Sequence, residues 1–399
     1  MPTSSTTRPL PPSQPESDAW VVAGPKSALA RLSPLIDAHS RCRRVRVVEI
    51  SAPSAQRHLK MQDDDASLLI IGDPRRSPRT ALPGIFVRAA NGRRIPTGCL
   101  PDVGDRLSDY ARAAAEVQLR SIPEPQLPNE SHLHPINDAR LRPTNSPAPG
   151  PFVLLGEFAP RALQWAEWFS NELPDHSIFQ WTAERITRPN LISGLRFGAG
   201  AAFYFGHGTP NGWFGYGGFD ESDALASRGR PIGCIISFSC SVARRPNLSG
   251  SACRPVHNSA RCSTDSVGDH SQSSARPPAQ SLNQNLSFCE DLVLSGLCAA
   301  AIGSTRLSLH HRNVEWSLAL AQILHRRHAT TLRDLLSDPA LPLPALNSYR
   351  ILGDPMAQLI GDPECASHSR KIFAPAPTDT LPILPLSRPL EFQPIEQQL

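Results

Sequence analysis

Short apolar runs alternate with amphipathic stretches between residues 152 and 353, and this alternation limits the fold more than any other feature of the sequence. The runs are typical of short strands buried on both faces, and they lie at 152–156, 176–181, 201–205, 233–238 and 299–303. The stretches between and after them predict helices at 161–173, 189–195, 288–294, 314–325 and 331–336. This order predicts an α/β fold, a mostly parallel sheet with helices on both faces. In such sheets the functional residues lie just beyond the carboxyl ends of strands.

The N-terminal third of the chain predicts a smaller α/β subdomain over residues 18–121. Residues 45–50 are rich in β-branched side chains, and residues 67–72 form a continuous apolar run, so both are expected to be strands. Residues 108–117 are expected to form a helix with Ser108 as its N-cap.

The remaining segments are set apart by composition, and the 41 prolines of the chain are concentrated in several of them. Residues 1–17 are rich in Ser, Thr and Pro and are expected to be disordered. Residues 122–151 carry eight prolines and are expected to be a linker. The second domain then spans 152–362, interrupted by a low-complexity insertion at 243–285, and a Pro-rich tail covers 363–399.

Composition also bears on partners and compartment. Forty Lys and Arg against 36 Asp and Glu leave a net charge of +4, too small to favour a nucleic-acid partner. The chain has no apolar run of transmembrane length and no apolar core of a signal peptide, so we expect no membrane partner and a cytoplasmic protein, with non-classical export as the alternative. Nine scattered cysteines do not suggest a disulfide framework.

Two of the predicted strands end in residues that can carry out covalent chemistry. His207 follows the strand at 201–205 and lies between Gly206 and Gly208, while Cys240 follows the strand at 233–238. If these strands are neighbours, an imidazole and a thiol meet at one edge of the sheet, and the imidazole can take the thiol proton. The alternative is that Cys240 is a packed, unreactive side chain.

Four segments in the same order resemble the gingipain family of cysteine peptidases, which belongs to the caspase-like group with caspases, legumain and separase. They are YFGHGTPNGW, IISFSCSVA, SFCEDLVLSGLCAAAIGSTRLS and YRILGDPMAQL, and they lie within residues 201–360, over which the resemblance extends. The resemblance implies a caspase-like sheet, with Cys240 as the nucleophile and His207 as its proton acceptor.

The resemblance also implies a residue that orients the histidine. The family has a glutamate just after the strand that opens the catalytic subdomain, and Glu157 holds that place here. A carboxylate in this position fixes the imidazole tautomer. The alternative for Glu157 is an ordinary solvated acid. Main-chain N–H groups of Gly208 and Cys240 are expected to stabilise the oxyanion.

The sequence departs from the gingipain pattern in the specificity region. The family carries an aspartate in the helix after the opening strand, whereas the helix at 161–173 has only Glu167 and Glu172 as acids. Preference for a basic residue at the cleavage site is therefore open, and an acidic residue there would need an arginine in the pocket.

Several further residues near these motifs have expected roles. Trp213 and Tyr216 are expected to bind substrate beside His207, the alternative being a packed aromatic turn. Asp354 is expected to be structural, in a turn that holds the last strand. His310 and His311 are expected in a solvated loop.

The insertion carries two further candidate functions. We expect no metal site at its Cys and His residues, because their spacing is irregular: Cys253, His257, Cys262 and His270. Activating cleavage is one hypothesis for its arginines and a neutral insertion is the other: Arg244, Arg245, Arg254, Arg261 and Arg276.

The expected function is that of a cysteine endopeptidase without a cofactor, acting on a protein or peptide. The alternative is a catalytically silent caspase-like module that regulates or binds another protein.

Overall fold

A computed structural model describes seven ranges of the chain: residues 19–50, 59–72, 84–121, 149–173, 178–246, 286–327 and 329–362. The expectations for the N-terminal segment, the Pro-rich tail, and most of the linker and the insertion therefore lie outside the described residues. The four Cys and His residues weighed as a metal site lie outside them too.

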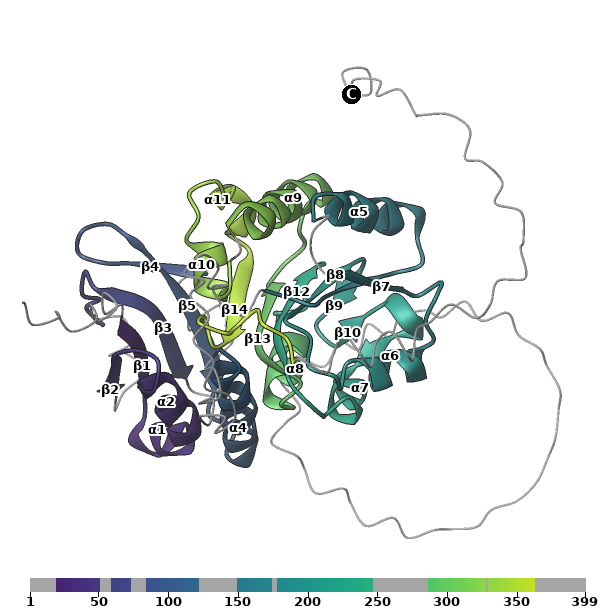
Figure 1. Cartoon of the computed structure of the whole chain (residues 1–399). Helices are drawn as coiled ribbons and strands as arrows, with labels where there is room; N and C mark the ends of the chain where they lie inside the picture. Colours follow the sequence, from purple (N-terminus) through teal and green to yellow (C-terminus); the bar gives the residue numbers. More distant parts are fainter. Residues whose placement is uncertain are drawn as a thin grey trace, which may run out of the picture.

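The described residues form one large sheet of 11 strands (Figure 1). Ten of its strands follow one another in the order β2-β1-β3-β5-β14-β13-β12-β8-β6-β7, and β4 pairs with β5 outside this path. The strands of the first part are β1 (Ala19–Gly24), β2 (Val45–Glu49), β3 (Asp65–Gly72), β4 (Phe86–Arg88) and β5 (Arg94–Pro101). Those of the second part are β6 (Phe152–Gly156), β7 (Ile178–Thr182), β8 (Ala201–Phe205), β12 (Ile232–Phe238), β13 (Cys298–Ser304) and β14 (Tyr349–Gly353).

The sheet consists of two parallel blocks that run in opposite directions. Strands β13, β12, β8, β6 and β7 are parallel neighbours, and so are β2, β1, β3, β5 and β14. The blocks join where β14 pairs antiparallel with β13. The carboxyl ends of β6, β8, β12 and β13 therefore share one edge of the sheet, and the carboxyl end of β14 lies at the opposite edge.

Helices cover both faces of the sheet, as the alternation of patterns predicts. In Figure 1, α5 and α9 lie over one face, while α2, α4 and α8 lie over the other. The helices of the first part are α1 (Lys26–Arg31), α2 (Ser33–Ser40) and α4 (Asp105–Leu119). Those of the second part are α5 (Pro160–Asn171), α6 (Arg188–Gly194), α7 (Glu221–Ala226), α8 (Phe288–Leu294), α9 (His310–Arg327), α10 (Leu332–Leu336) and α11 (Leu343–Leu346). None of the helices in these ranges is long and apolar enough to span a bilayer.

The α/β fold class is confirmed, and the differences from expectation are local. The helix expected at 108–117 begins earlier, at Asp105, with Gly104 rather than Ser108 as its N-cap. His310 and His311 open α9 instead of lying in a loop. The N-terminal strands join the same sheet as the rest through the pairing of β5 with β14. The division into two domains stays a prediction.

Asp354 has the structural surroundings that were expected of it. Its buried carboxylate lies just after β14 and accepts four hydrogen bonds, from Trp20 Nε1 at 3.1 Å, His39 Nε2 at 2.8 Å, Gln118 Nε2 at 2.9 Å and Met356 N at 3.0 Å. Three of these donors come from β1, α2 and α4, so this carboxylate connects the N-terminal strands and helices to the last strand. We call these five residues the Asp354 cluster.

Candidate active site

Strand order places the candidate catalytic residues at one edge of the sheet. β8 and β12 are parallel neighbours with Phe205 opposite Phe238. His207 and Cys240 each follow this pair by two residues, on strands separated by about 4.8 Å. β6 lies on the other side of β8 with Gly156 opposite Phe205, so the next residue, Glu157, leaves the sheet at the same edge.

Glu157 contacts His207 in the way that an orienting carboxylate would. Its Oε2 accepts a hydrogen bond from the main-chain N–H of His207 at 2.7 Å and lies 2.8 Å from Nδ1 of the ring. Because a carboxylate is only an acceptor, the ring donates from Nδ1, and in the neutral ring Nε2 then carries the lone pair. The ring is 75% exposed while Glu157 is 23% exposed, so the free nitrogen is open to an incoming substrate.

The glycines on either side of His207 are required by close approach. A Cβ on Gly206 would lie 2.8 Å from Cβ and 2.9 Å from Oε2 of Glu157. A Cβ on Gly208 would lie 2.6 Å from Oγ of Ser239 and 3.0 Å from the carbonyl oxygen of Cys240. The His207 loop therefore runs tightly between Glu157 on one side and the end of β12 on the other, and any larger residue would force these elements apart.

The sulfur of Cys240 faces the loop between β13 and α9. The main-chain N–H of Ser308 lies 3.4 Å from Sγ, and the Ser308 carbonyl and hydroxyl oxygens lie at 3.7 Å and 3.8 Å. Asn313 donates to the Ser308 hydroxyl at 2.9 Å and accepts from Tyr349 at 2.8 Å, which holds this loop in place. In the described part of the chain, no hydrogen bond joins Cys240 to His207.

The segment after Cys240 is held firmly from two sides. Ser241 adopts a left-handed backbone conformation with φ of 59°, and the main chain of Ala243 bonds to Ser304 at 2.9 Å. Arg245 forms a buried two-pronged ion pair with Glu290, with its Nε 2.9 Å and its Nη2 2.6 Å from the two carboxylate oxygens. Glu290 also accepts from the N–H of Ser287 at the start of α8.

This ion pair changes the interpretation of one predicted residue. Arg245 was one of five arginines considered as activating cleavage sites, but its side chain is buried against Glu290 and is therefore a poor protease target. Arg254, Arg261 and Arg276 lie outside the described residues, so cleavage within the insertion stays a prediction.

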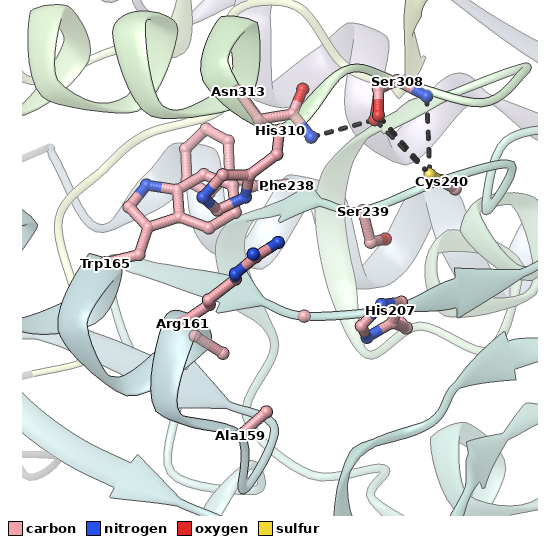
Figure 2. A pocket seen from close by; sticks show the side chains of 12 residues that line it. Ala159, Arg161, Trp165, His207, Phe238, Ser239, Cys240, Ser308, His310 and Asn313 are labelled. Atoms are coloured by element: carbon pink, nitrogen blue, oxygen red, sulfur yellow. Dashed lines mark hydrogen bonds between the residues drawn. The ribbon is translucent and has the colours of Figure 1, made fainter. Parts of the chain in front are cut away.

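His207 and Cys240 line one pocket with a volume of about 180 Å³ (Figure 2). Its other walls come from the start of α5, the end of β12 and the start of α9; they are Ala159, Arg161, Ala162, Trp165, Gly206, Phe238, Ser239, Ser308, His310 and Asn313. The figure shows His207 and Cys240 on the same side of this pocket, with the sulfur turned toward Ser308. The shared edge of β8 and β12 thus brings the two candidate catalytic side chains to one opening.

The expectation for Trp213 is wrong. Its side chain is only 2% exposed, stacks on Tyr204 with ring centroids 4.4 Å apart, and donates to Ser237 Oγ at 2.8 Å. It is part of the core and cannot bind substrate without local unfolding. The packed aromatic turn considered as the alternative is the arrangement found.

Tyr216 is also largely buried, with 7% exposure, and its main role is to connect strand ends. Its hydroxyl accepts from the N–H of Gly156 at 3.0 Å and donates to the carbonyl of Trp181. Burial raises the pKa of this hydroxyl well above its ordinary value, so it stays protonated. Its edge lines a second pocket on the other side of Glu157, separate from the pocket with Cys240.

Exposed apolar side chains gather around the candidate site. Leu307 and Leu309 flank Ser308, Phe158 follows Glu157, and all three are more than half exposed. Phe214 is half exposed, and its ring centroid lies 6.4 Å from that of His207. An exposed apolar rim around a pocket is typical of a surface that binds an extended chain.

Cys240 differs from most other thiols of the described chain. Burial raises the pKa of four of them, which remain protonated and unreactive: Cys99, Cys234, Cys289 and Cys298. Cys42 and Cys240 are the two described cysteines that are only partly buried. No group of three His, Cys, Asp or Glu side chains within the seven described ranges is arranged to hold a metal ion.

Sequence reasoning missed part of the pocket wall. Ser308 and Asn313 were not expected, although β13 ends beside β12 and its following loop therefore had to approach Cys240. Arg161 was treated only as the start of a helix. The signal available for all three was their place after a strand that ends at the catalytic edge.

Comparisons with known proteins support the fold. No protein-family model matches the chain, and no curated protein matches it by sequence. The crystal structure of the Arg-specific cysteine proteinase gingipain R (RgpB) aligns over 88% of this chain and 80% of its own, with 14% identical residues and a TM-score of 0.54.

Two further solved structures align with this chain to a similar extent. A complex of the pro- and mature domains of Porphyromonas gingivalis RgpB covers 86% of this chain and 80% of its own, with 14% identity and a TM-score of 0.54. A structure described as a protease aligns over 86% of this chain and 78% of its own, with 11% identical residues and a TM-score of 0.53. At these identities the likeness establishes a caspase-like fold of the gingipain type.

Proposed function

We propose that this protein is a cysteine endopeptidase. The observation that carries the proposal is the hydrogen bond from Nδ1 of His207 to Glu157, which leaves Nε2 free at the pocket that Cys240 also lines. A thiol, an oriented imidazole and a carboxylate at one opening form the set of groups that acyl transfer requires.

In this mechanism the Cys240 thiol loses its proton to Nε2 of His207 as Sγ attacks the carbonyl carbon of the substrate. Glu157 keeps the ring in the correct tautomer and stabilises its protonated form. His207 then gives the proton to the leaving amine as the C–N bond breaks, which leaves a thioester on Cys240. A water molecule that loses a proton to His207 hydrolyses the thioester and regenerates the thiol.

Two features of the described site fit this sequence of steps: the lack of a hydrogen bond between Cys240 and His207, and the closeness of the Gly208 and Cys240 main chains. Nucleophile and base are often not yet hydrogen-bonded in free enzymes, and the contact tightens when substrate binds. We assign the main-chain N–H groups of Gly208 and Cys240 to the oxyanion. The 3.0 Å approach of a Gly208 Cβ to the Cys240 carbonyl supports this assignment, because the two backbones are adjacent.

We propose an extended protein or peptide as the substrate. The exposed side chains of Phe158, Leu307 and Leu309 adjoin pocket residues along the chain, and Phe214 lies near His207, so this apolar rim can contact substrate residues beyond the cleaved bond. A small-molecule site would instead enclose its ligand more fully.

Labelling with a peptidyl chloromethyl ketone, followed by mass-spectrometric mapping, tests the proposal. Label is expected at Cys240 in the wild type, with none at that position in Cys240→Ala and a rate at least about 100-fold lower in His207→Ala. Cys42→Ala removes the other partly buried cysteine of the described chain and is the matched control, which should label like the wild type.

Equal labelling across the cysteines, unchanged in His207→Ala, would refute the proposal. Turnover of a fluorogenic peptide library gives a second readout, before and after limited proteolysis. If no turnover depends on Cys240 in either state, the protein is a silent caspase-like module that binds a partner.

A further inference from the structure

The pocket beside Cys240 is the right size for one side chain. Its volume of about 180 Å³ slightly exceeds that of cavities of roughly 150 Å³ that take up benzene. Because His207 and Cys240 line it directly, we assign to this pocket the side chain of the residue whose carbonyl is attacked. The walls of this pocket therefore determine which residue lies on the acyl side of the cleaved bond.

Apart from the thiol of Cys240, the ionisable groups of this pocket are all potential cations. Arg161 and His310 line it together with His207, and no carboxylate is among its lining residues. Figure 2 shows the Arg161 side chain extending from the start of α5 into the pocket, between His310 and His207. Within the described ranges no carboxylate pairs with Arg161, whereas Arg188, which lines the second pocket, pairs with Asp223 at 2.8 Å.

The surrounding elements add to the positive potential. Burial lowers the pKa of His310, and the nearby Arg161, His311 and His207 lower it further, as a positive potential at this ring would. Residues from the first turns of α5 and α9 line the pocket, and neither first turn contains an acid. The positive ends of two helix dipoles therefore lie at a pocket that already holds an arginine.

We propose that this pocket selects an acidic side chain, Asp or Glu, on the acyl side of the cleaved bond, with Arg161 binding its carboxylate and the His310 ring as a second donor. This inference rests on the proposed peptidase function. An acidic side chain gives Arg161 its missing partner in a two-pronged geometry. A Lys or Arg side chain would meet a like charge with no acid to bind it, and an apolar one would cover the guanidinium without pairing it.

Fluorogenic peptides that differ only at the acyl-side residue test this inference. In the wild type, kcat/KM for Asp or Glu should exceed that for Lys or Arg by at least about 100-fold. Arg161→Glu should lower kcat/KM for the acidic peptides at least about 100-fold and raise it for the basic ones, while an Ala peptide changes little. Arg312→Glu is the matched control. Arg312 is an exposed arginine in the first turn of α9, the turn that also carries His310, but Arg312 itself does not line the pocket.

The outcomes separate this inference from the proposed function. If Cys240-dependent cleavage favours a basic or apolar residue, or if Arg161→Glu and Arg312→Glu change the ranking equally, the acidic pocket is refuted and the peptidase stands. Iodoacetamide, which has no side chain for the pocket, reports on the thiol alone. If Cys240 is not labelled faster than Cys42 and no peptide is cleaved, both the function and the pocket assignment fail.

Discussion

Replacing Asp354 is expected to destabilise the protein strongly without altering its catalytic groups. The carboxylate lies after β14, at the sheet edge opposite His207 and Cys240, and it is fully buried. Each of its oxygens accepts two hydrogen bonds: Oδ1 from Trp20 and Met356, and Oδ2 from His39 and Gln118. Because the carboxylate is fully buried, solvent cannot replace these hydrogen bonds when it is removed.

The magnitude follows from counting the donors. In Asp354→Asn the amide oxygen can keep two of them, and the new NH2 group faces the other two. His39 can adapt by moving its proton to Nδ1, which has no partner now, but the amide of Gln118 cannot. Losing one to two hydrogen bonds to a charged acceptor costs about 1.5–6 kcal/mol at about 1.5–3 kcal/mol each. Asp354→Ala orphans all four donors and leaves a cavity, so its cost approaches the whole stability of a typical domain, roughly 5–15 kcal/mol.

Urea denaturation followed by tryptophan fluorescence measures the free energy of unfolding. Asp354→Asn should lower it by about 1.5–6 kcal/mol, and Asp354→Ala should not yield folded protein. Asp37→Asn is the control, because Asp37 is exposed on the same helix as His39, and its effect should stay within about 0.5 kcal/mol. A loss below about 1 kcal/mol in Asp354→Ala would refute the proposed role of the cluster.

The pH dependence of stability provides a second test of the Asp354 cluster. Burial holds the pKa of His39 below its ordinary value and outweighs the attraction of Asp354. Burial opposes ionisation of Asp354, but the nearby His39 and the hydrogen bonds from His39 and Met356 outweigh it, so its pKa lies below its ordinary value too. As the pH falls, both groups are therefore protonated at a higher pH in the unfolded chain than in the folded protein. The free energy of unfolding should decrease below about pH 6.5 through His39 and below about pH 4 through Asp354. Replacing His39 with Gln should flatten the change between about pH 7 and pH 5; an unchanged slope would contradict this.

Three further predictions concern the site and its support. Glu157→Gln should keep KM and lower kcat about 10- to 100-fold, because the amide cannot stabilise protonated His207; full activity in steady-state assays would show that Glu157 is only a solvated acid. Gly208→Ala should lower kcat/KM about 100-fold, since its Cβ would lie 2.6 Å from two side-chain atoms; a folded and fully active variant would contradict the close approach. Arg245→Met should cost about 3–5 kcal/mol in urea denaturation by leaving Glu290 buried and unpaired. The double variant Arg245→Met with Glu290→Met should recover part of that loss. If the double variant loses as much free energy of unfolding as Arg245→Met alone, the result would argue against a buried ion pair.

The sequence predicted the elements that are determined by local pattern. The strands before His207 and Cys240 could be found because each is a short apolar run followed by glycine or small polar residues. Their meeting at one edge followed from the general behaviour of parallel strands, and the register of Phe205 opposite Phe238 agrees with it. Glu157 was placed by resemblance, and its contact with His207 is what that resemblance implied.

The misplaced residues depend on packing that no local pattern encodes. Trp213 lies in a glycine-rich turn that looks exposed in sequence, but Phe219 and Phe288 enclose its ring, and Phe288 lies 75 residues further along the chain (288 − 213). The roles of Arg161 and Ser308 depend on which strands are neighbours, and the sheet order supplies that information. A pattern of strands and helices identifies the edge that carries the chemistry, whereas the composition of the pocket wall requires the topology.

The two opposed blocks of the sheet separate stability from catalysis. The residues that line the pocket lie between Ala159 and Asn313, so none of them comes from the described N-terminal strands and helices. Those elements instead supply Trp20, His39 and Gln118 to the Asp354 cluster at the opposite edge. Substitutions in the N-terminal part should therefore reduce activity through the fraction of folded protein, leaving the activity per folded molecule unchanged. Substitutions of Glu157, His207 and Cys240 should instead lower the activity per folded molecule and leave the folded fraction unchanged, because these side chains are partly exposed and bury little surface.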